Sequence, residues 1–129
     1  MNITLTDGLP SITVTLTYHG KPYMIDRVLL DTGSGGSVFS TDVLLSCGIH
    51  YEMHDMVHRI RGVGGTEFVF SKIVDQLAIG ELCCDQFAIE VGVMDYGMPL
   101  NGIIGMDFLC AVNAVIDLAQ SRIFAHHDV

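Results

Sequence analysis

The strongest constraint on the fold is an apolar run, Val28-Leu29-Leu30, that ends abruptly in Asp31-Thr32-Gly33-Ser34. An apolar run of this length beside Gly-rich sequence predicts a buried β-strand. Gly33 then allows the backbone to turn where a side chain would clash. The pattern predicts a carboxylate at the end of a buried strand, with the hydroxyl residues Thr32 and Ser34 beside it to hold it. Because a lone buried carboxylate is costly, we expect Asp31 to have a partner that shares its proton or its hydrogen bonds.

The length of 129 residues predicts one domain that spans residues 1–129. Half of the residues are hydrophobic, yet no apolar segment approaches the roughly 20 residues that a membrane helix needs. We therefore expect no membrane partner, and we expect the surplus apolar surface to cover a subunit interface. Fourteen glycines, together with many β-branched residues, favour short strands and tight turns. The predicted fold class is all-β.

The formal net charge of -9, with only six Lys and Arg residues, argues against nucleic acid or an anionic membrane as a partner. The four cysteines form no C-x-x-C pair, so their spacing predicts neither a disulfide framework nor a zinc site. We expect buried free thiols in a reducing compartment. The N-terminal residues lack the basic and apolar regions of a signal peptide, which makes the cytoplasm the expected location.

Alternation of apolar and polar residues predicts a half-buried strand at 11–18, with Ile12, Val14, Leu16 and Tyr18 on one face. A tight turn at 19–22 leads into the strand that delivers Asp31. Further strands are expected at 2–6, 38–40, 57–61, 67–74, 84–93, 101–105, 114–118 and 122–125. Short helices are expected at 42–47, with Thr41 as N-cap, and at 106–111.

Two further glycine elements follow the Asp31 segment. Gly62-Val63-Gly64-Gly65 lies between two β-like arms and predicts a long, mobile hairpin. Ile103-Ile104-Gly105 is an apolar strand that is closed by a glycine and followed by a short helix. D-T-G alone is a weak signal, whereas the three elements together are a much stronger one.

In this order and at this spacing, the three elements resemble those of the retropepsin-like aspartic proteases, over roughly residues 12–124. The D-T-G segment resembles their catalytic loop, the segment 62–65 their flap tip, and the segment 103–105 the element that crosses beneath the loop. The resemblance implies a single-lobe closed β-barrel with a flap hairpin and one or two short helices. Because the chain holds one D-T-G, the resemblance also implies a homodimer in which each subunit contributes Asp31.

The implied activity is that of an aspartic endopeptidase without metal or other cofactor. Two carboxylates about 3 Å apart cannot both ionise, so in aspartic proteases the pair holds one proton. One carboxylate acts as general base on a water, and the other hydrogen-bonds the scissile carbonyl. Extended peptide would lie as an added strand between flap and floor. By resemblance the substrate-binding residues are Gly62, Val63, Gly64, Gly65, Ile103 and Ile104.

The resemblance gives the other residues of the catalytic loop distinct roles. Thr32 would brace the opposite loop across the two-fold axis, and Gly33 would let the two loops approach closely. We also hypothesise that Ser34 donates a hydrogen bond to the carboxylate and moves the activity optimum towards acid. Gly35-Gly36 and Met106 stand where viral members carry acidic residues and an Arg. The internal salt bridge of the viral enzymes is therefore absent, and the chain looks more like the cellular and bacterial branches.

Two alternatives remain open at this point. One is a catalytically inactive module of the same fold that dimerises or binds peptide. The other is a thiol or metal enzyme, because His50, His54 and His58 recur every four residues and would share one face of a helix. We expect these to be solvated histidines instead. Asp26, Asp42, Asp107 and Asp117 are expected to be caps or surface charges.

Overall fold

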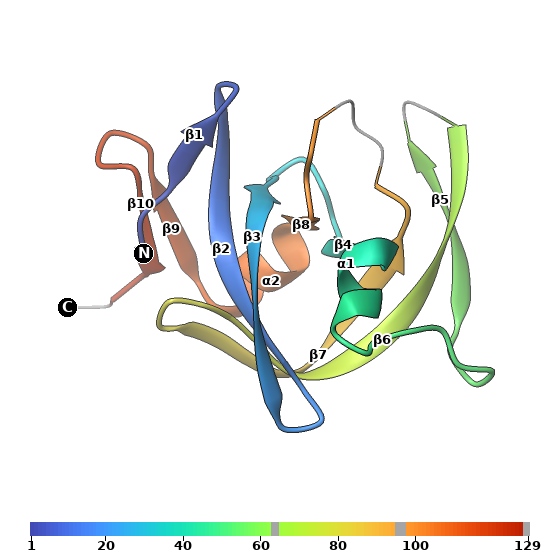
Figure 1. The fold of residues 1–129 in the computed structure, drawn as a ribbon. Helices are drawn as coiled ribbons and strands as arrows, with labels where there is room; N and C mark the ends of the chain where they lie inside the picture. Colours follow the sequence, from blue (N-terminus) through green and yellow to red (C-terminus); the bar gives the residue numbers. More distant parts are fainter. Residues whose placement is uncertain (63–64, 95–97, 128–129) are drawn as a thin grey trace.

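The computed structural model describes residues 1–62, 65–94 and 98–127 (Figure 1). It contains ten strands: β1 (Thr4–Thr6), β2 (Leu9–Tyr18), β3 (Lys21–Leu30), β4 (Val38–Ser40), β5 (Val57–Gly62), β6 (Gly65–Ile79), β7 (Leu82–Gly92), β8 (Gly102–Ile104), β9 (Ala114–Asp117) and β10 (Arg122–Ala125). The two helices are short: α1 (Thr41–Ser46) and α2 (Met106–Ala111). The predicted all-β class with short helices is confirmed.

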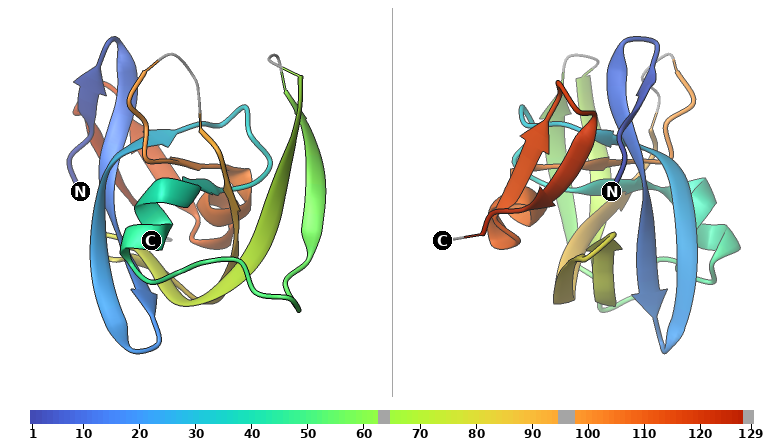
Figure 2. Two further views of the ribbon diagram at one scale, coloured as in Figure 1. Left: turned by 45° about the vertical axis from the view of Figure 1, so that its right-hand side comes forward. Right: turned by 90° about the vertical axis from the view of Figure 1, so that its left-hand side faces the viewer.

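Eight strands form one sheet in the order β1-β2-β3-β8-β4-β7-β6-β5, and an additional pairing of β2 with β6 closes six of them into a ring. The pairs β3–β8 and β4–β7 are parallel, and the other pairs are antiparallel. Figure 2 shows the β5–β6 hairpin and the β1–β2 hairpin on opposite sides of the same end of the molecule. The connection from β3 to β4 lies between them, so the ring presents the Asp31 segment at this end.

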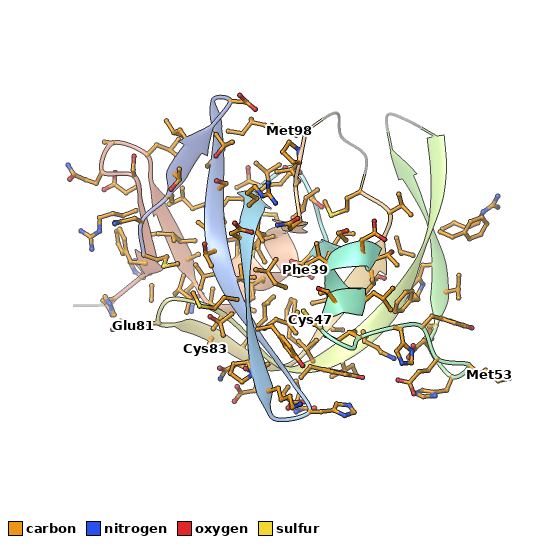
Figure 3. All side chains as sticks on the ribbon, in the orientation of Figure 1. Phe39, Cys47, Met53, Glu81, Cys83 and Met98 are labelled. Atoms are coloured by element: carbon orange, nitrogen blue, oxygen red, sulfur yellow. The ribbon has the colours of Figure 1, made fainter. Side chains whose placement is uncertain are left out.

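The alternating pattern of the second strand explains how the ring is filled. Ile12, Val14 and Leu16 are at most 4% exposed, so the predicted inward face of this strand is confirmed. Phe39 and Phe108 are fully buried, and Figure 3 shows Phe39 in the middle of the molecule. This apolar core supports β3 and β8, the two strands beneath the Asp31 segment.

The turn between β2 and β3 contains only His19 and Gly20, because Tyr18 pairs directly with Lys21. Both turn residues have positive φ values, 49° and 79°. Such left-handed conformations suit the twist of a two-residue hairpin, and Gly adopts them without strain. The predicted turn is therefore confirmed, and it is two residues long.

Some local predictions were wrong. Helix α1 begins at Thr41, and its N-cap is Ser40, whose side chain makes no capping hydrogen bond. The four cysteines are free, as expected, but none is buried. Cys83 and Cys84 are neighbours on β7, and strand alternation turns Cys84 towards the core while Cys83 is exposed.

The two ends of the chain meet in a small sheet beside the ring. β9 pairs with β10, and residues 1–3 run along the other edge of β10. Ile3 N donates to Ser121 O over 2.8 Å, and Ile123 N donates to Met1 O over 2.9 Å. The expected strand at 2–6 is thus divided between this sheet and β1. In the part of the chain that the structure describes, no helix is long and apolar enough to cross a membrane.

Candidate active site

Asp31 directly follows β3 and begins a tight turn. Its N–H donates to Ile104 O over 2.9 Å, and its carbonyl oxygen accepts a hydrogen bond from Ser34 N over 3.1 Å. The side chain is half-buried, whereas Thr32 and Gly33 are exposed. Gly33 N donates to Asp31 Oδ1 over 2.9 Å. Backbone groups therefore fix a carboxylate that solvent can reach.

Gly33 is suited to this turn because there is little room beside the carboxylate. A Cβ atom at position 33 would lie 3.2 Å from Asp31 Oδ1, which is tighter than ordinary van der Waals contact. Glycine leaves the N–H close to the oxygen that it binds. Among the described residues, no donor is bonded to Asp31 Oδ2.

The hypothesis about Ser34 is wrong in this structure. The Ser34 hydroxyl donates to Gly36 O over 2.8 Å, and a hydroxyl has only one proton to donate. Ser34 therefore stabilises the glycine-rich part of the loop and leaves the Asp31 carboxylate to Gly33. An acid shift of activity through this hydroxyl is not supported.

The loop is held against the corner between β8 and α2 by backbone contacts. Met106 N donates to Ser34 O over 2.8 Å, and Asp107 N donates to Gly35 O over 3.1 Å. At Gly105, a Cβ atom would lie 2.7 Å from Ser34 O, a distance that real Cβ atoms do not show. Only glycine lets the corner approach the loop this closely.

Asp107 has a larger role than the sequence predicted. Its Oδ1 accepts hydrogen bonds from the Ser37 hydroxyl and from Phe108 N, both over 2.8 Å, and its Oδ2 accepts one from Ser37 N over 3.2 Å. Ser37 is only 1% exposed, and its hydroxyl oxygen accepts from Gly105 N over 3.0 Å. This clasp of a buried serine and an exposed aspartate joins the end of the Asp31 loop to α2. The only signal in the sequence was an acid two residues after the Ile-Ile-Gly element.

Ile103 and Ile104 support β3, the strand that leads to Asp31. They pair with Leu29 and Leu30 in the parallel β3–β8 ladder. Their side chains are 5% and 0% exposed. Their predicted contact with substrate stays a prediction. They act as the floor that carries Asp31.

The predicted flap corresponds to the β5–β6 hairpin. Val57 pairs with Phe70 at its base, and Gly62 pairs with Gly65 near its tip. Val63 and Gly64 lie outside the described residues. The two-armed hairpin around Gly62 and Gly65 agrees with the prediction, and the contact of these residues with substrate stays a prediction.

The base of this hairpin holds a buried cation. Lys72 is 5% exposed, and its Nζ donates to Glu52 Oε1 over 2.8 Å and to Asp55 Oδ2 over 2.7 Å. Burial opposes the charge of Lys72, but the hydrogen bonds to Asp55 and Glu52 raise its pKa above the ordinary value. The Lys72 ammonium in turn lowers the pKa of Glu52; it also lowers that of Asp55, although burial of Asp55 acts in the opposite direction.

The three regularly spaced histidines do not share a helical face, because residues 50–56 are not helical. His50 and His54 are exposed. His58 lies on β5, and its Nε2 is 2.8 Å from the hydroxyl of Ser71, which donates to Glu90 Oε2 over 3.1 Å. The expectation of a merely solvated His58 is therefore wrong. The described part of the chain contains no group of His, Cys, Asp and Glu arranged to hold a metal ion.

A groove of about 360 Å³ lies beside the catalytic loop. Thr32 forms part of its wall. α2 contributes Met106 and Cys110, the turn after it Asn113, and β9 Ile116. No residue that lines the groove is charged. The exposed side of the loop therefore continues into an uncharged surface.

Comparison with known proteins agrees with this geometry. A family model described as aspartyl protease matches residues 14–108, a span that contains the Asp31 turn, the β5–β6 hairpin and the corner at Gly105. No curated protein matches the chain. The family match covers well over half of the sequence. The chain belongs to the retropepsin-like aspartyl protease family.

Proposed function

We propose that residues 1–129 form one protease domain, and that the protein is an aspartic endopeptidase whose active form is a homodimer. The observation that carries this proposal is the Asp31 turn, where Gly33 N binds one carboxylate oxygen and no described residue donates to the other. Thr32 and Gly33 are exposed beside it. One chain supplies a single such carboxylate, so the second must come from another copy.

The chemistry follows from two carboxylates that share one proton. The ionised carboxylate takes a proton from a bound water, whose oxygen forms a bond to the carbon of the scissile peptide. The protonated carboxylate hydrogen-bonds the carbonyl oxygen while this bond forms. The C–N bond then breaks, and the leaving nitrogen takes a proton from the pair. No covalent intermediate is required.

The substrate class is an extended peptide. A peptide strand can be bound by backbone hydrogen bonds when it is added beside existing strands. The β5–β6 hairpin would cover such a strand and exclude water from the reaction. A formal net charge of -9, with only six Lys and Arg residues, does not favour an anionic substrate.

Cleavage of a mixed peptide library from acid to neutral pH tests the proposal. The wild type is compared with Asp31→Asn, which replaces one carboxylate oxygen by an amide. The matched control is Glu81→Gln, which makes the same chemical change at an exposed residue in the turn between β6 and β7 (Figure 3). Sedimentation of each protein gives its oligomeric state.

We expect cuts by wild type and Glu81→Gln, and none by Asp31→Asn. Cuts that persist in Asp31→Asn would exclude Asp31 as the catalytic group. A dimeric wild type that cuts no peptide at any pH would refute the protease and favour the inactive peptide-binding module.

A further inference from the structure

The outer arm of the β5–β6 hairpin has backbone support on one side. β5 lies at the end of the sheet order, and among the described strands it pairs only with β6. Figure 1 shows it on the side of the molecule opposite β1. Because the outer edge of such a strand has no ladder, side-chain contacts add to the support that β6 gives it.

Three polar side chains connect this arm to the body of the sheet. His58 on β5, Ser71 on β6 and Glu90 on β7 are all half-buried. His58 Nε2 is 2.8 Å from Ser71 Oγ, and Ser71 Oγ is 3.1 Å from Glu90 Oε2. Ser71 and Glu90 also stand directly opposite each other in the β6–β7 ladder. The three side chains therefore join β5 to β7 across β6.

The donors fix the direction of these hydrogen bonds. An ionised carboxylate only accepts, so the single hydroxyl proton of Ser71 goes to Glu90. The hydroxyl oxygen then accepts from His58, whose Nε2 must carry a hydrogen. Ser71 supplies both the acceptor for His58 and the donor for Glu90. Removal of this one hydroxyl therefore breaks both contacts.

Glu90 continues the connection towards Asp31. Its backbone N–H donates to Ser37 O over 2.9 Å. Ser37 is the buried serine of the clasp, and its hydroxyl donates to Asp107 over 2.8 Å. Asp107 N in turn donates to Gly35 O in the Asp31 loop over 3.1 Å. A contiguous series of hydrogen-bonded residues thus runs from the outer arm of the hairpin to this loop.

Lys72 follows Ser71 on the same strand but lies outside this series. Its Nζ donates to Glu52 and Asp55, which belong to the segment between α1 and β5. In the part of the chain that the structure describes, no hydrogen bond joins either carboxylate to the Asp31 loop. The contacts of Lys72 hold the hairpin base without reaching that loop.

We propose that the hairpin–loop series, defined as His58, Ser71, Glu90, Ser37 and Asp107, couples the position of the hairpin to that of the Asp31 loop. A contiguous hydrogen-bonded network can carry such a coupling between two sites. The first three members are positioning residues, because they act through the clasp and not on a substrate. The role of the coupling in catalysis rests on the proposed function, whereas the coupling itself needs no substrate.

Hydrogen exchange of Ser71→Ala tests the coupling in the absence of substrate. The variant lacks the hydroxyl that joins His58 to Glu90, and a half-buried carboxylate that loses its donor turns towards water. Under native conditions, where amides exchange by local opening, we expect the Met106 and Asp107 amides to exchange about tenfold faster.

Ser71→Thr is the matched control, because threonine keeps the hydroxyl and suits a strand. A cavity of about 490 Å³ beside Ser71 leaves room for the added methyl group. We expect wild-type exchange in this variant. Lys72→Met is a second control on the same strand. It should speed exchange at the hairpin base and leave exchange of the Asp107 amide unchanged.

Coupling between two sites is reciprocal, so the hairpin should respond to a change in the clasp. Asp107→Asn should speed exchange of the β5 amides, whereas Asp42→Asn, the same change in α1, should not. On a peptide substrate, Ser71→Ala should lower kcat about tenfold with little change in KM, and Ser71→Thr should not. Adding Asp107→Asn to Ser71→Ala should lower kcat by less than the product of the two single losses.

The outcomes separate this inference from the proposed function. Unchanged exchange at Met106 and Asp107 in Ser71→Ala, or equal acceleration there in Lys72→Met, would overturn the coupling. Faster exchange in Ser71→Ala alone, with a dimeric wild type that cuts no peptide, supports the coupling and refutes the protease. Wild-type cleavage by Ser71→Ala, with exchange unaltered, refutes the coupling and supports the protease.

Discussion

The catalytic loop and the base of the β5–β6 hairpin are held in place by different kinds of contact. The loop is fixed by backbone hydrogen bonds and by the close approach of Gly105, with Asp107 as the one charged side chain in its clasp. The hairpin base is fixed by Lys72 between two carboxylates. Backbone contacts do not titrate, whereas ion pairs do. The position of Asp31 should therefore be less sensitive to pH than the position of the hairpin.

The largest effect is expected from Gly105→Ala, which tests the backbone contact. The added Cβ would meet the carbonyl oxygen of Ser34 at 2.7 Å, and a backbone atom in a hydrogen-bonded loop cannot rotate away. Forced overpacking of this kind typically costs about 1–3 kcal/mol, occasionally more. We expect a loss of about 3 kcal/mol in the free energy of unfolding, measured by urea denaturation, together with loss of cleavage.

Gly35→Ala is the matched control, because it makes the same change in the loop that the corner at Gly105 contacts. A Cβ at Gly35 meets no atom within 4 Å. We expect its stability to change by less than about 0.5 kcal/mol. Equal losses in the two variants would show that the loop, and not the corner at Gly105, is the sensitive element.

The next largest effect is expected from Lys72→Met at the hairpin base. Methionine keeps much of the aliphatic chain but leaves the nearly buried Asp55 carboxylate, whose side chain is 6% exposed, without its partner. Removal of one member of a buried pair is strongly destabilising, but Glu52 is partly exposed. We therefore expect the free energy of unfolding, measured by urea denaturation, to fall by about 2 kcal/mol.

Lys21→Met provides the comparison for this variant, because Lys21 is an exposed lysine at the start of β3. Its loss of charge should leave stability nearly unchanged. A similar loss in both variants would attribute the effect to net charge and not to the buried pair.

Asp107→Asn should have a smaller effect on stability and a clear effect on turnover. In the variant, the amide nitrogen would replace the carboxylate oxygen that accepts a hydrogen bond from Ser37 N. Two donors would then face each other, and we expect the free energy of unfolding to fall by about 1–2 kcal/mol. Because Asp107 acts through the loop and does not touch substrate, we expect a lower kcat with little change in KM. Steady-state kinetics on a peptide substrate separates the two constants.

Helix α1 supplies a close control for Asp107, since Asp42 is also the second residue of a six-residue helix and is exposed. Asp42→Asn should change neither stability nor kcat. If Asp107→Asn behaves like Asp42→Asn, Asp107 is a helix-end charge and not part of the clasp.

The sequence predicted the elements whose signals are local. The apolar run before Asp31, the alternation of β2 and the glycine that ends β8 each reflect a few adjacent residues, and the structure matches them. The contacts that hold these elements together are not local. Asp107 and Ser37 are 70 residues apart, and the sequence of neither segment predicts that the two residues are in contact.

The misassigned polar residues share the same cause. Composition predicts that a carboxylate or an imidazole lies at the surface, because most do. His58 and the buried Lys72 depart from this rule because the ring of strands brings β5, β6, β7 and the loops together. Asp107 is exposed, and what its sequence did not indicate is the number of hydrogen bonds that its carboxylate accepts. Ile104 is fully buried, and its sequence does not distinguish a floor beneath Asp31 from a pocket for substrate.

The smallest effect is a pH dependence of local stability, which should differ between the hairpin base and the Asp31 loop. The Lys72 ammonium lowers the pKa of Glu52 and of Asp55 in the folded chain, relative to ordinary values of 4.5 and 3.8. Their contribution to stability is therefore complete above those ordinary values, and it is lost as the pH falls through the lower folded-state values. The raised pKa of Lys72 makes its contribution complete below 10.5, and that contribution is lost only in strong alkali.

Hydrogen exchange between neutral pH and about pH 3, corrected for intrinsic exchange rates, tests this difference. Protection of the β6 amides near Lys72 should fall on acidification in the wild type, whereas that of Asp31, Met106 and Asp107 should change less. In Lys72→Met the acid-dependent loss at β6 should largely disappear, because the ion pairs that titrate are already absent. If protection fell equally at β6 and at the Asp31 loop, in the wild type and in Lys72→Met, acid would weaken the ring of strands as a whole. The contrast between a backbone-held loop and a charge-held hairpin would then be wrong.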